Sequence, residues 1–123
     1  MKTVLIADDE PSLRLLVQAT LESDDYRIIE ATNGDEAWAL LQQQPPSVAL
    51  LDVQMPGLTG LELTRAIRAK PDIFQNTRVI LLTSKAQTAD VAAGLAAGAD
   101  HYLTKPFSPL ELMSVVERAI GVS

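Results

Sequence analysis

Short, continuous runs of apolar residues alternate along the chain with longer stretches in which apolar residues recur at helical spacing. The clearest apolar runs lie in residues 4–7, 48–51 and 78–82. Such runs are typical of strands that are covered on both faces of a parallel sheet. Residues 26–31 and 101–103 are more mixed in character, and we expect them to form strands at the edges of the same sheet.

Five helices are predicted between and after these strands, each with apolar residues three and four positions apart on one buried face. They span residues 10–23, 33–43, 60–70, 88–97 and 108–120. The last helix is the most sharply delimited, because Ser108 and Glu111 form a capping box at its start and Gly121 supplies a stop.

The strict alternation of strand and helix predicts an α/β fold with a doubly wound, five-stranded parallel sheet flanked by five helices, a flavodoxin-like architecture. A strand order of 2-1-3-4-5 places the apolar strands in the centre and follows from right-handed crossovers. The sequence contains no linker, repeat or low-complexity segment. We therefore expect residues 1–123 to form one domain.

Composition excludes several classes of site. The 123 residues include no cysteine and one histidine, which excludes disulfides, thiolate zinc sites, cysteine nucleophiles and multi-histidine metal sites. Ten basic and sixteen acidic residues give a net charge of -6, so we expect no direct binding of nucleic acid. No apolar run approaches the ~18 residues of a membrane span, and the start lacks a signal peptide. We expect a cytoplasmic protein without a membrane association.

Polar side chains follow the predicted strands, at the edge where open parallel sheets place their functional crevice. These side chains are Asp8 and Asp9, Asp52, the hydroxyl pair Thr83 and Ser84, and Lys105. Lys85 follows the hydroxyl pair, and it either lies at the mouth of this crevice or points into solvent.

Three carboxylates at one edge need a compensating cation. Two unit charges ~4 Å apart interact by about 4 kcal/mol at an effective dielectric near 20. One lysine cannot balance three acids, whereas Mg²⁺ suits an all-oxygen set of ligands. In the plainer interpretation some of these acids only cap helices, as Asp9 could. A carboxylate, Mg²⁺, a hydroxyl and a lysine are together what transfer of a phosphoryl group to an aspartate requires.

Four motifs in this chain resemble those of receiver domains of the response-regulator family in two-component signalling, such as the single-domain chemotaxis regulators. The motifs are Ile6–Glu10, Leu51–Gly57 followed by Gly60, Leu82–Ser84, and Gly98–Phe107. They occur in the family's order and span nearly the whole chain. The resemblance implies a phosphorylation-controlled switch rather than a turnover enzyme.

The resemblance also implies a role for each acid. Asp52 would accept a phosphoryl group from the phosphohistidine of a histidine kinase, and the domain would catalyse only transfer to, and hydrolysis from, this residue. Asp9 and Asp52 would bind Mg²⁺ directly, together with the backbone carbonyl of Gln54. Asp8 would act on the ion through water.

The remaining motif residues would respond to the phosphoryl group. Thr83 would hydrogen-bond it, Lys105 would pair with it, and the bond between Lys105 and Pro106 would be cis. As Thr83 moves toward the added charge, Tyr102 would rotate inward behind it, as a threonine–tyrosine pair does in the family. In the plainer interpretation, Tyr102 is a half-exposed aromatic residue on an edge strand.

The resemblance implies protein partners: a histidine kinase or phosphotransfer protein as donor, and a downstream effector protein or domain as reader. Relatives that dimerise in the winged-helix branch usually carry basic residues midway along the last helix. Here residues 113–117 contain none, and only Arg118 is basic. We expect a monomer or a weak, phosphorylation-dependent dimer.

Three other functions use a similar fold. A phosphate-independent scaffold usually lacks one of the acids or the lysine, and this chain lacks none of them. A phosphatase of the haloacid-dehalogenase type, which is Mg²⁺-dependent, places a second acid two residues after its nucleophile, where this chain has Gln54. A flavin carrier needs a hydroxyl- and glycine-rich loop after the first strand, where this chain has acids.

Overall fold

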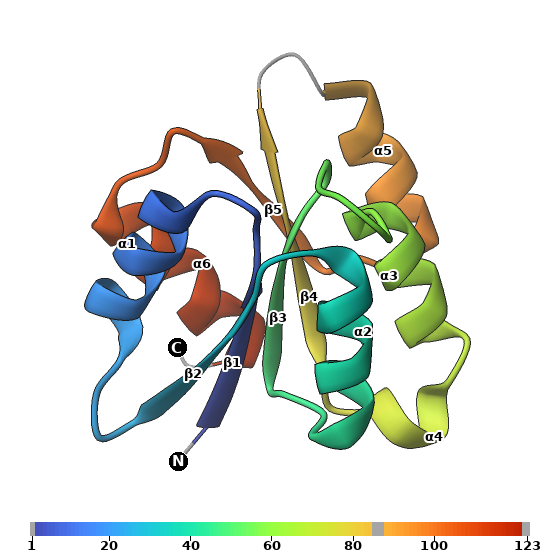
Figure 1. Cartoon of the computed structure of the whole chain (residues 1–123), viewed down its shortest axis with the longest axis horizontal. Coiled ribbons are helices and arrows are strands. Elements are labelled where there is room, and N and C mark those ends of the chain that lie inside the picture. Colours follow the sequence, from blue (N-terminus) through green and yellow to red (C-terminus); the bar gives the residue numbers. More distant parts are fainter. Residues whose placement is uncertain (1, 85–87, 122–123) are drawn as a thin grey trace.

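A five-stranded parallel sheet with helices on both faces forms the structure, a computed structural model that describes residues 2–84 and 88–121 (Figure 1). The strands are β1 (Lys2–Ala7), β2 (Tyr26–Ala31), β3 (Val48–Asp52), β4 (Arg78–Ser84) and β5 (His101–Lys105). The helices are α1 (Pro11–Leu21), α2 (Gly34–Gln43), α3 (Gly60–Arg68), α4 (Pro71–Phe74), α5 (Thr88–Ala97) and α6 (Pro109–Ile120).

The strand order is β2-β1-β3-β4-β5, which confirms the predicted order and fold class. All four strand pairs are parallel, so all carboxyl ends lie at the same edge of the sheet. Every residue of the central strand β3 is buried. The sheet therefore presents the last residues of β1, β3 and β4 side by side at one edge.

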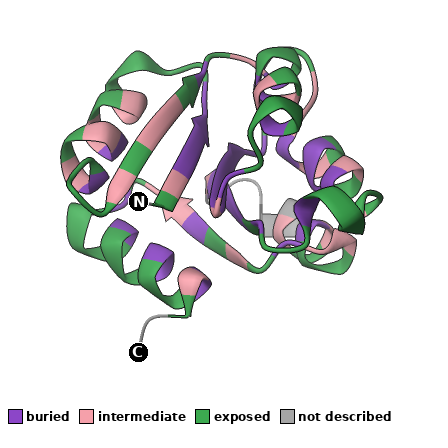
Figure 2. Ribbon diagram, turned by 90° about the horizontal axis from the view of Figure 1, so that it is seen from below, coloured by how far each residue is buried: buried purple, intermediate pink, exposed green. Residues whose placement is uncertain are grey.

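Helices α1 and α6 cover one face of the sheet, and α2, α3 and α5 cover the other (Figure 1). Because alternate side chains of a strand point to opposite faces, each central strand supplies both cores. Leu50, for example, packs in the core under α1 and α6, whereas Leu51 packs in the core under α2 and α3. Figure 2 shows this burial concentrated in the central strands, with the outer helix surfaces exposed.

The structure differs from the predicted elements at several boundaries. The described residues form six helices, because a single turn, Pro71–Phe74, precedes β4 and was not predicted. Helix α3 ends at Arg68, before this turn. Strands β4 and β5 extend further than predicted, through Ser84 and Lys105, because these two residues still pair in the parallel ladder.

The predicted capping box of the last helix is confirmed. The hydroxyl of Ser108 accepts a hydrogen bond from the Glu111 N–H at 3.1 Å, and the Glu111 carboxylate accepts one from the Ser108 N–H at 3.0 Å. Gly121 ends the helix in the left-handed region, at a φ of 85°. Among the described residues, no helix has the length and apolar character needed to cross a bilayer.

Candidate functional site

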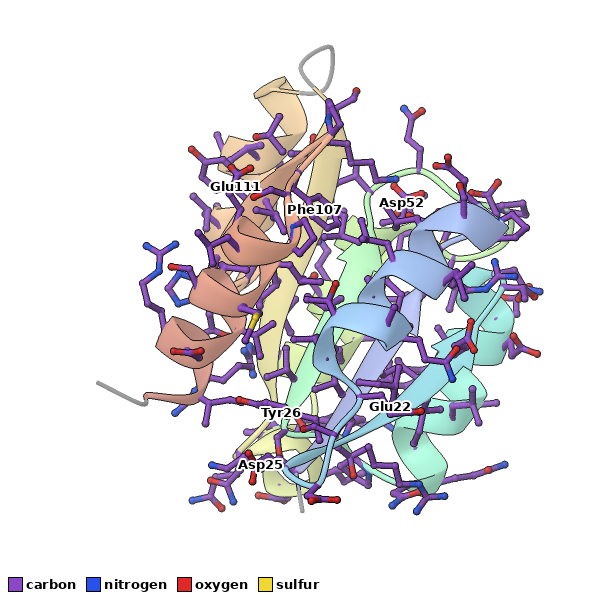
Figure 3. All side chains as sticks on the ribbon, turned by 90° about the vertical axis from the view of Figure 1, so that its left-hand side faces the viewer. Glu22, Asp25, Tyr26, Asp52, Phe107 and Glu111 are labelled. Carbon is purple, nitrogen blue, oxygen red and sulfur yellow. The ribbon has the colours of Figure 1, made fainter. Side chains whose placement is uncertain are left out.

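Three acids meet at the carboxyl edge of the sheet, as the sequence predicted. Carboxylate oxygens of Asp8, Asp9 and Asp52 lie within 4.8 Å of one another. Asp8, just beyond β1, is fully buried, and Asp52, the last residue of β3, is 5% exposed. Asp9 is exposed. Figure 3 shows Asp52 near one end of the sheet, with Asp25 and Tyr26 near the other.

The same local turn fixes the two buried acids. Oδ1 of Asp8 accepts a hydrogen bond from the N–H of Glu10 at 2.9 Å, and Oδ1 of Asp52 accepts one from the N–H of Gln54 at 3.2 Å. An aspartate that accepts from the N–H two residues ahead closes an Asx turn. These backbone donors were not predicted, although an acid at the end of a strand is the signal for such a turn.

Lys105 joins the two buried acids. Its Nζ atom lies 2.8 Å from Oδ2 of Asp8 and 3.3 Å from Oδ2 of Asp52. The bond between Lys105 and Pro106 is cis, as the resemblance implied. One ammonium beside three carboxylates leaves two negative charges without a partner within this cluster.

The surroundings shift the pKa of both members of the Lys105–Asp52 pair. Burial, with the charge of Asp8, raises the pKa of Asp52 from 3.8 to about 6, although Lys105 and the Gln54 N–H oppose the shift. Burial alone would lower the pKa of Lys105. The hydrogen bond to Asp8 and the charges of Asp52 and Asp8 outweigh burial, so this pKa is raised. Lys105 therefore stays charged at neutral pH.

The hydroxyl and aromatic candidates lie on β4 and on the edge strand β5. Thr83 is 1% exposed, and its hydroxyl donates to the carbonyl oxygen of Ser84 at 3.2 Å. The side chain of Tyr102 is on the edge strand and 48% exposed. The outward Tyr102 of this structure matches the plainer interpretation of this residue. Gln54 is exposed, and Lys85 lies outside the described residues.

The donor set fits a hard divalent cation. The cluster offers carboxylate oxygens, which Mg²⁺ prefers, and the exposed side of Asp9 leaves room for the water ligands that Mg²⁺ retains. Two uncompensated negative charges match the charge of such an ion. The residues of this cluster that could hold Mg²⁺ are therefore Asp8, Asp9 and Asp52.

The sequence profile of the family described as "Response regulator receiver domain" matches residues 4–117 of this chain. This chain belongs to the receiver domain family. The receiver domain has curated relatives such as the response regulator GtcR of Aneurinibacillus migulanus, with 40% identity over 116 residues. The phosphate regulon transcriptional regulatory protein PhoB of Pseudomonas aeruginosa is 39% identical over 113 residues.

The match covers 94% of this receiver domain but 46% of GtcR, and 92% of the domain but 49% of PhoB. The chain thus spans about half the length of these curated relatives. Receiver domains are signalling switches, and these two relatives are named as a response regulator and a transcriptional regulatory protein.

Solved structures share the fold over the whole receiver domain. The chemotaxis protein CheY4 of Vibrio cholerae has a TM-score of 0.87 and 34% identity, covering 97% of this chain and 98% of its own. The receiver domain of sensor histidine kinase PA1611 from Pseudomonas aeruginosa has a TM-score of 0.85 and 32% identity, covering 98% of both chains. That structure is described with a magnesium ion coordinated in its active site cleft.

Proposed function

We propose that this receiver domain is a phosphorylation-controlled switch, in which Asp52 accepts a phosphoryl group from a histidine kinase or a phosphotransfer protein. The observation that carries the proposal is the cluster around Asp52: a buried carboxylate with Asp8 and Asp9 beside it and the Lys105 ammonium 3.3 Å away. A carboxylate must be ionised to act as a nucleophile at neutral pH. With a pKa of about 6, the Asp52 side chain is mostly ionised at pH 7.

In the transfer step an Asp52 oxygen forms a bond to phosphorus while the bond from phosphorus to the donor's imidazole nitrogen breaks. The electron pair of the broken bond returns to that nitrogen. Asp9, Asp52 and the Gln54 backbone carbonyl would hold Mg²⁺ directly, and Asp8 would hold it through water. Bound there, the ion would neutralise charge on the phosphoryl oxygens. Lys105 supplies a further positive charge.

Phosphorylation would change the charge at the strand ends. An aspartyl phosphate carries about one more negative charge than the carboxylate it replaces, together with new acceptor oxygens. Thr83 would turn its hydroxyl toward these oxygens, and Tyr102 would move from its exposed position into the vacated space. Helix α5, next to these residues in the chain, has several alanines and few large anchors, which favours a low local stability. A downstream effector protein or domain would read the changed surface.

The domain would act on itself only, by phosphotransfer to and hydrolysis from Asp52. Some relatives are named as transcriptional regulators and are about twice as long, so an output domain of such a protein is one form that the effector can take. Three further statements remain predictions from the sequence. The receiver itself would bind no nucleic acid, it would be a monomer or a weak dimer, and it would be cytoplasmic.

Intact-mass measurement tests the proposal. The chain incubated with acetyl phosphate and Mg²⁺ should gain the mass of one phosphoryl group, and Asp52→Asn should gain none. Asp72→Asn is the control, because it changes an exposed acid in helix α4, outside the cluster. This variant should gain the phosphoryl mass as the natural chain does. A natural chain that never gains mass would favour the phosphate-independent scaffold, and an Asp52→Asn chain that does gain mass would place the acceptor elsewhere.

A further inference from the structure

Arg14, in the first half of α1, contacts the backbone of the acidic cluster rather than its carboxylates. Its Nη1 atom donates a hydrogen bond to the carbonyl oxygen of Asp8 at 2.7 Å. Its Nε atom donates to Oε1 of Glu30, on the edge strand β2, at 3.3 Å. The Arg14 side chain is 15% exposed, so this guanidinium lies largely inside the fold.

The carbonyl that Arg14 contacts belongs to the peptide between Asp8 and Asp9. The N–H of Asp8 still donates to the Ala31 carbonyl at 3.2 Å, as a continuation of the β1–β2 ladder. Past this point the chain leaves the sheet. Because a peptide group is planar, a hydrogen bond to the Asp8 carbonyl also fixes the direction of the Asp9 N–H and Cα.

The two acids differ in what else holds them. The Asp8 carboxylate is held by the Glu10 N–H and by Lys105. For Asp9, no hydrogen bond or ion pair to its carboxylate is found within residues 2–84 and 88–121. Its exposed carboxylate therefore depends on the backbone for its place in the cluster.

We infer that Arg14 is a positioning residue for Asp9: it holds the Asp8–Asp9 peptide so that the Asp9 carboxylate faces the cation site. The inference deepens the proposed function and rests on it, because Mg²⁺ is the ion that Asp9 would hold. Arg14 acts through the backbone and touches neither the ion nor the phosphoryl group.

The direction in which Mg²⁺ affinity changes when Arg14 is replaced separates a positioning role from a purely electrostatic one. A guanidinium beside the cluster repels a divalent cation, so removal of its charge alone should strengthen Mg²⁺ binding. Loss of a positioning contact should weaken it, because residues that orient metal ligands typically contribute about tenfold or more to metal affinity. The two expectations differ in direction as well as in size.

Titration calorimetry of Mg²⁺ into the unphosphorylated chain is the test. Arg14→Met should weaken binding by about tenfold. Arg27→Met loses the same charge from an exposed site at the start of β2 and should bind as the natural chain does. Glu30→Gln leaves an oxygen for the Nε atom and the Asp8 contact intact, and should also bind normally. Phosphorylation of Arg14→Met by acetyl phosphate should require a higher Mg²⁺ concentration. At saturating Mg²⁺ the variant should be phosphorylated at close to the rate of the natural chain.

An Arg14→Met chain that binds Mg²⁺ as tightly as the natural chain, or more tightly, overturns the inference. If Arg14→Met does not fold, Arg14→Lys tests the inference instead. Lysine keeps the positive charge but lacks the planar guanidinium group with its several donors. The Arg14→Lys chain should bind Mg²⁺ more weakly than the natural chain, and unchanged binding by it again overturns the inference. A natural chain that binds no Mg²⁺ would overturn the proposed function instead, so the two failures are distinguishable.

Discussion

The ammonium of Lys105 lies 2.8 Å from Oδ2 of Asp8, although 97 positions separate the two residues in the chain. Asp8 is fully buried, so water contributes little to the solvation of its charge. Because the same ammonium lies 3.3 Å from Asp52, a change of charge at Asp52 acts directly on the Lys105–Asp8 pair.

Lys105→Met should lower the stability of the metal-free protein without loss of Mg²⁺ binding. The variant leaves two buried carboxylates without their ammonium, a change that typically costs about 3 kcal/mol. Affinity for Mg²⁺ should be unchanged or higher, because a repelling charge is removed. Urea unfolding without divalent ions and calorimetric titration measure the two effects. Lys2→Met, at an exposed lysine, serves as the control, and weaker Mg²⁺ binding by Lys105→Met would mean that its role is misassigned.

The contribution of Asp52 to the stability of the metal-free protein should decrease as the pH rises from about 4 to about 6. The pKa of Asp52 is raised in the folded state, so the native protein binds this proton more tightly than the unfolded chain does. Its contribution is present below the ordinary pKa of 3.8 and is lost as the pH rises through about 6. A shift of this size corresponds to about 1–3 kcal/mol.

Asp52→Asn should remove this part of the pH dependence. The advantage of the variant over the natural chain should be small near pH 4 and should reach about 1–3 kcal/mol at pH 7. Urea unfolding at a series of pH values in a chelating buffer measures it. Parallel curves for the two proteins across this range would show that burial does not raise the pKa of Asp52.

Mg²⁺ should stabilise the folded protein through Asp9. A ligand that binds only the native state adds about 2.7 kcal/mol when its free concentration is about a hundredfold above its Kd. Asp9→Asn should lose most of this gain while folding normally without the ion, since Asp9 is exposed. Thermal unfolding with Mg²⁺ and with a chelator measures the difference. Asp25→Asn, far from the cluster in Figure 3, should keep the full gain, and an equal gain in both variants would refute the assignment.

Beryllofluoride with Mg²⁺, which mimics a bound phosphoryl group, should perturb the backbone amides around Thr83 and Tyr102. The added negative charge draws the Thr83 hydroxyl, and the exposed Tyr102 ring becomes more buried. Amide spectra by nuclear magnetic resonance follow both residues. Thr83→Ala should keep the response near Asp52 and lose it at Tyr102. If only the residues that touch the metal respond in the natural chain, the proposed coupling is wrong.

The sequence predicts the sheet well because its signals are local. Each central strand is a short apolar run, and the strand order follows from the alternation with helices. The acids converge because parallel strands end at one edge, a rule that needs no coordinates. The capping box of Ser108 and Glu111 is likewise complete within four consecutive residues.

The remaining features depend on contacts that local patterns do not encode. The turn Pro71–Phe74 is too short to show a helical period. Thr83, Ser84 and Lys105 are polar and therefore look like loop residues, yet β4 and β5 extend through them because the ladder continues. Arg14 reaches Asp8 from one turn into a helix, and a surface position is the natural expectation for an arginine there.

The separation of 97 positions between Asp8 and Lys105 also has a consequence for synthesis of the protein. The ribosome makes Asp8 and Asp9 early and Lys105 after four of the five strands, so the acids emerge long before the ammonium that bridges them. A nascent chain that stops short of β5 would carry Asp52, the proposed phosphoacceptor, without its lysine. On the proposed function, such unfinished polypeptides should accept a phosphoryl group poorly.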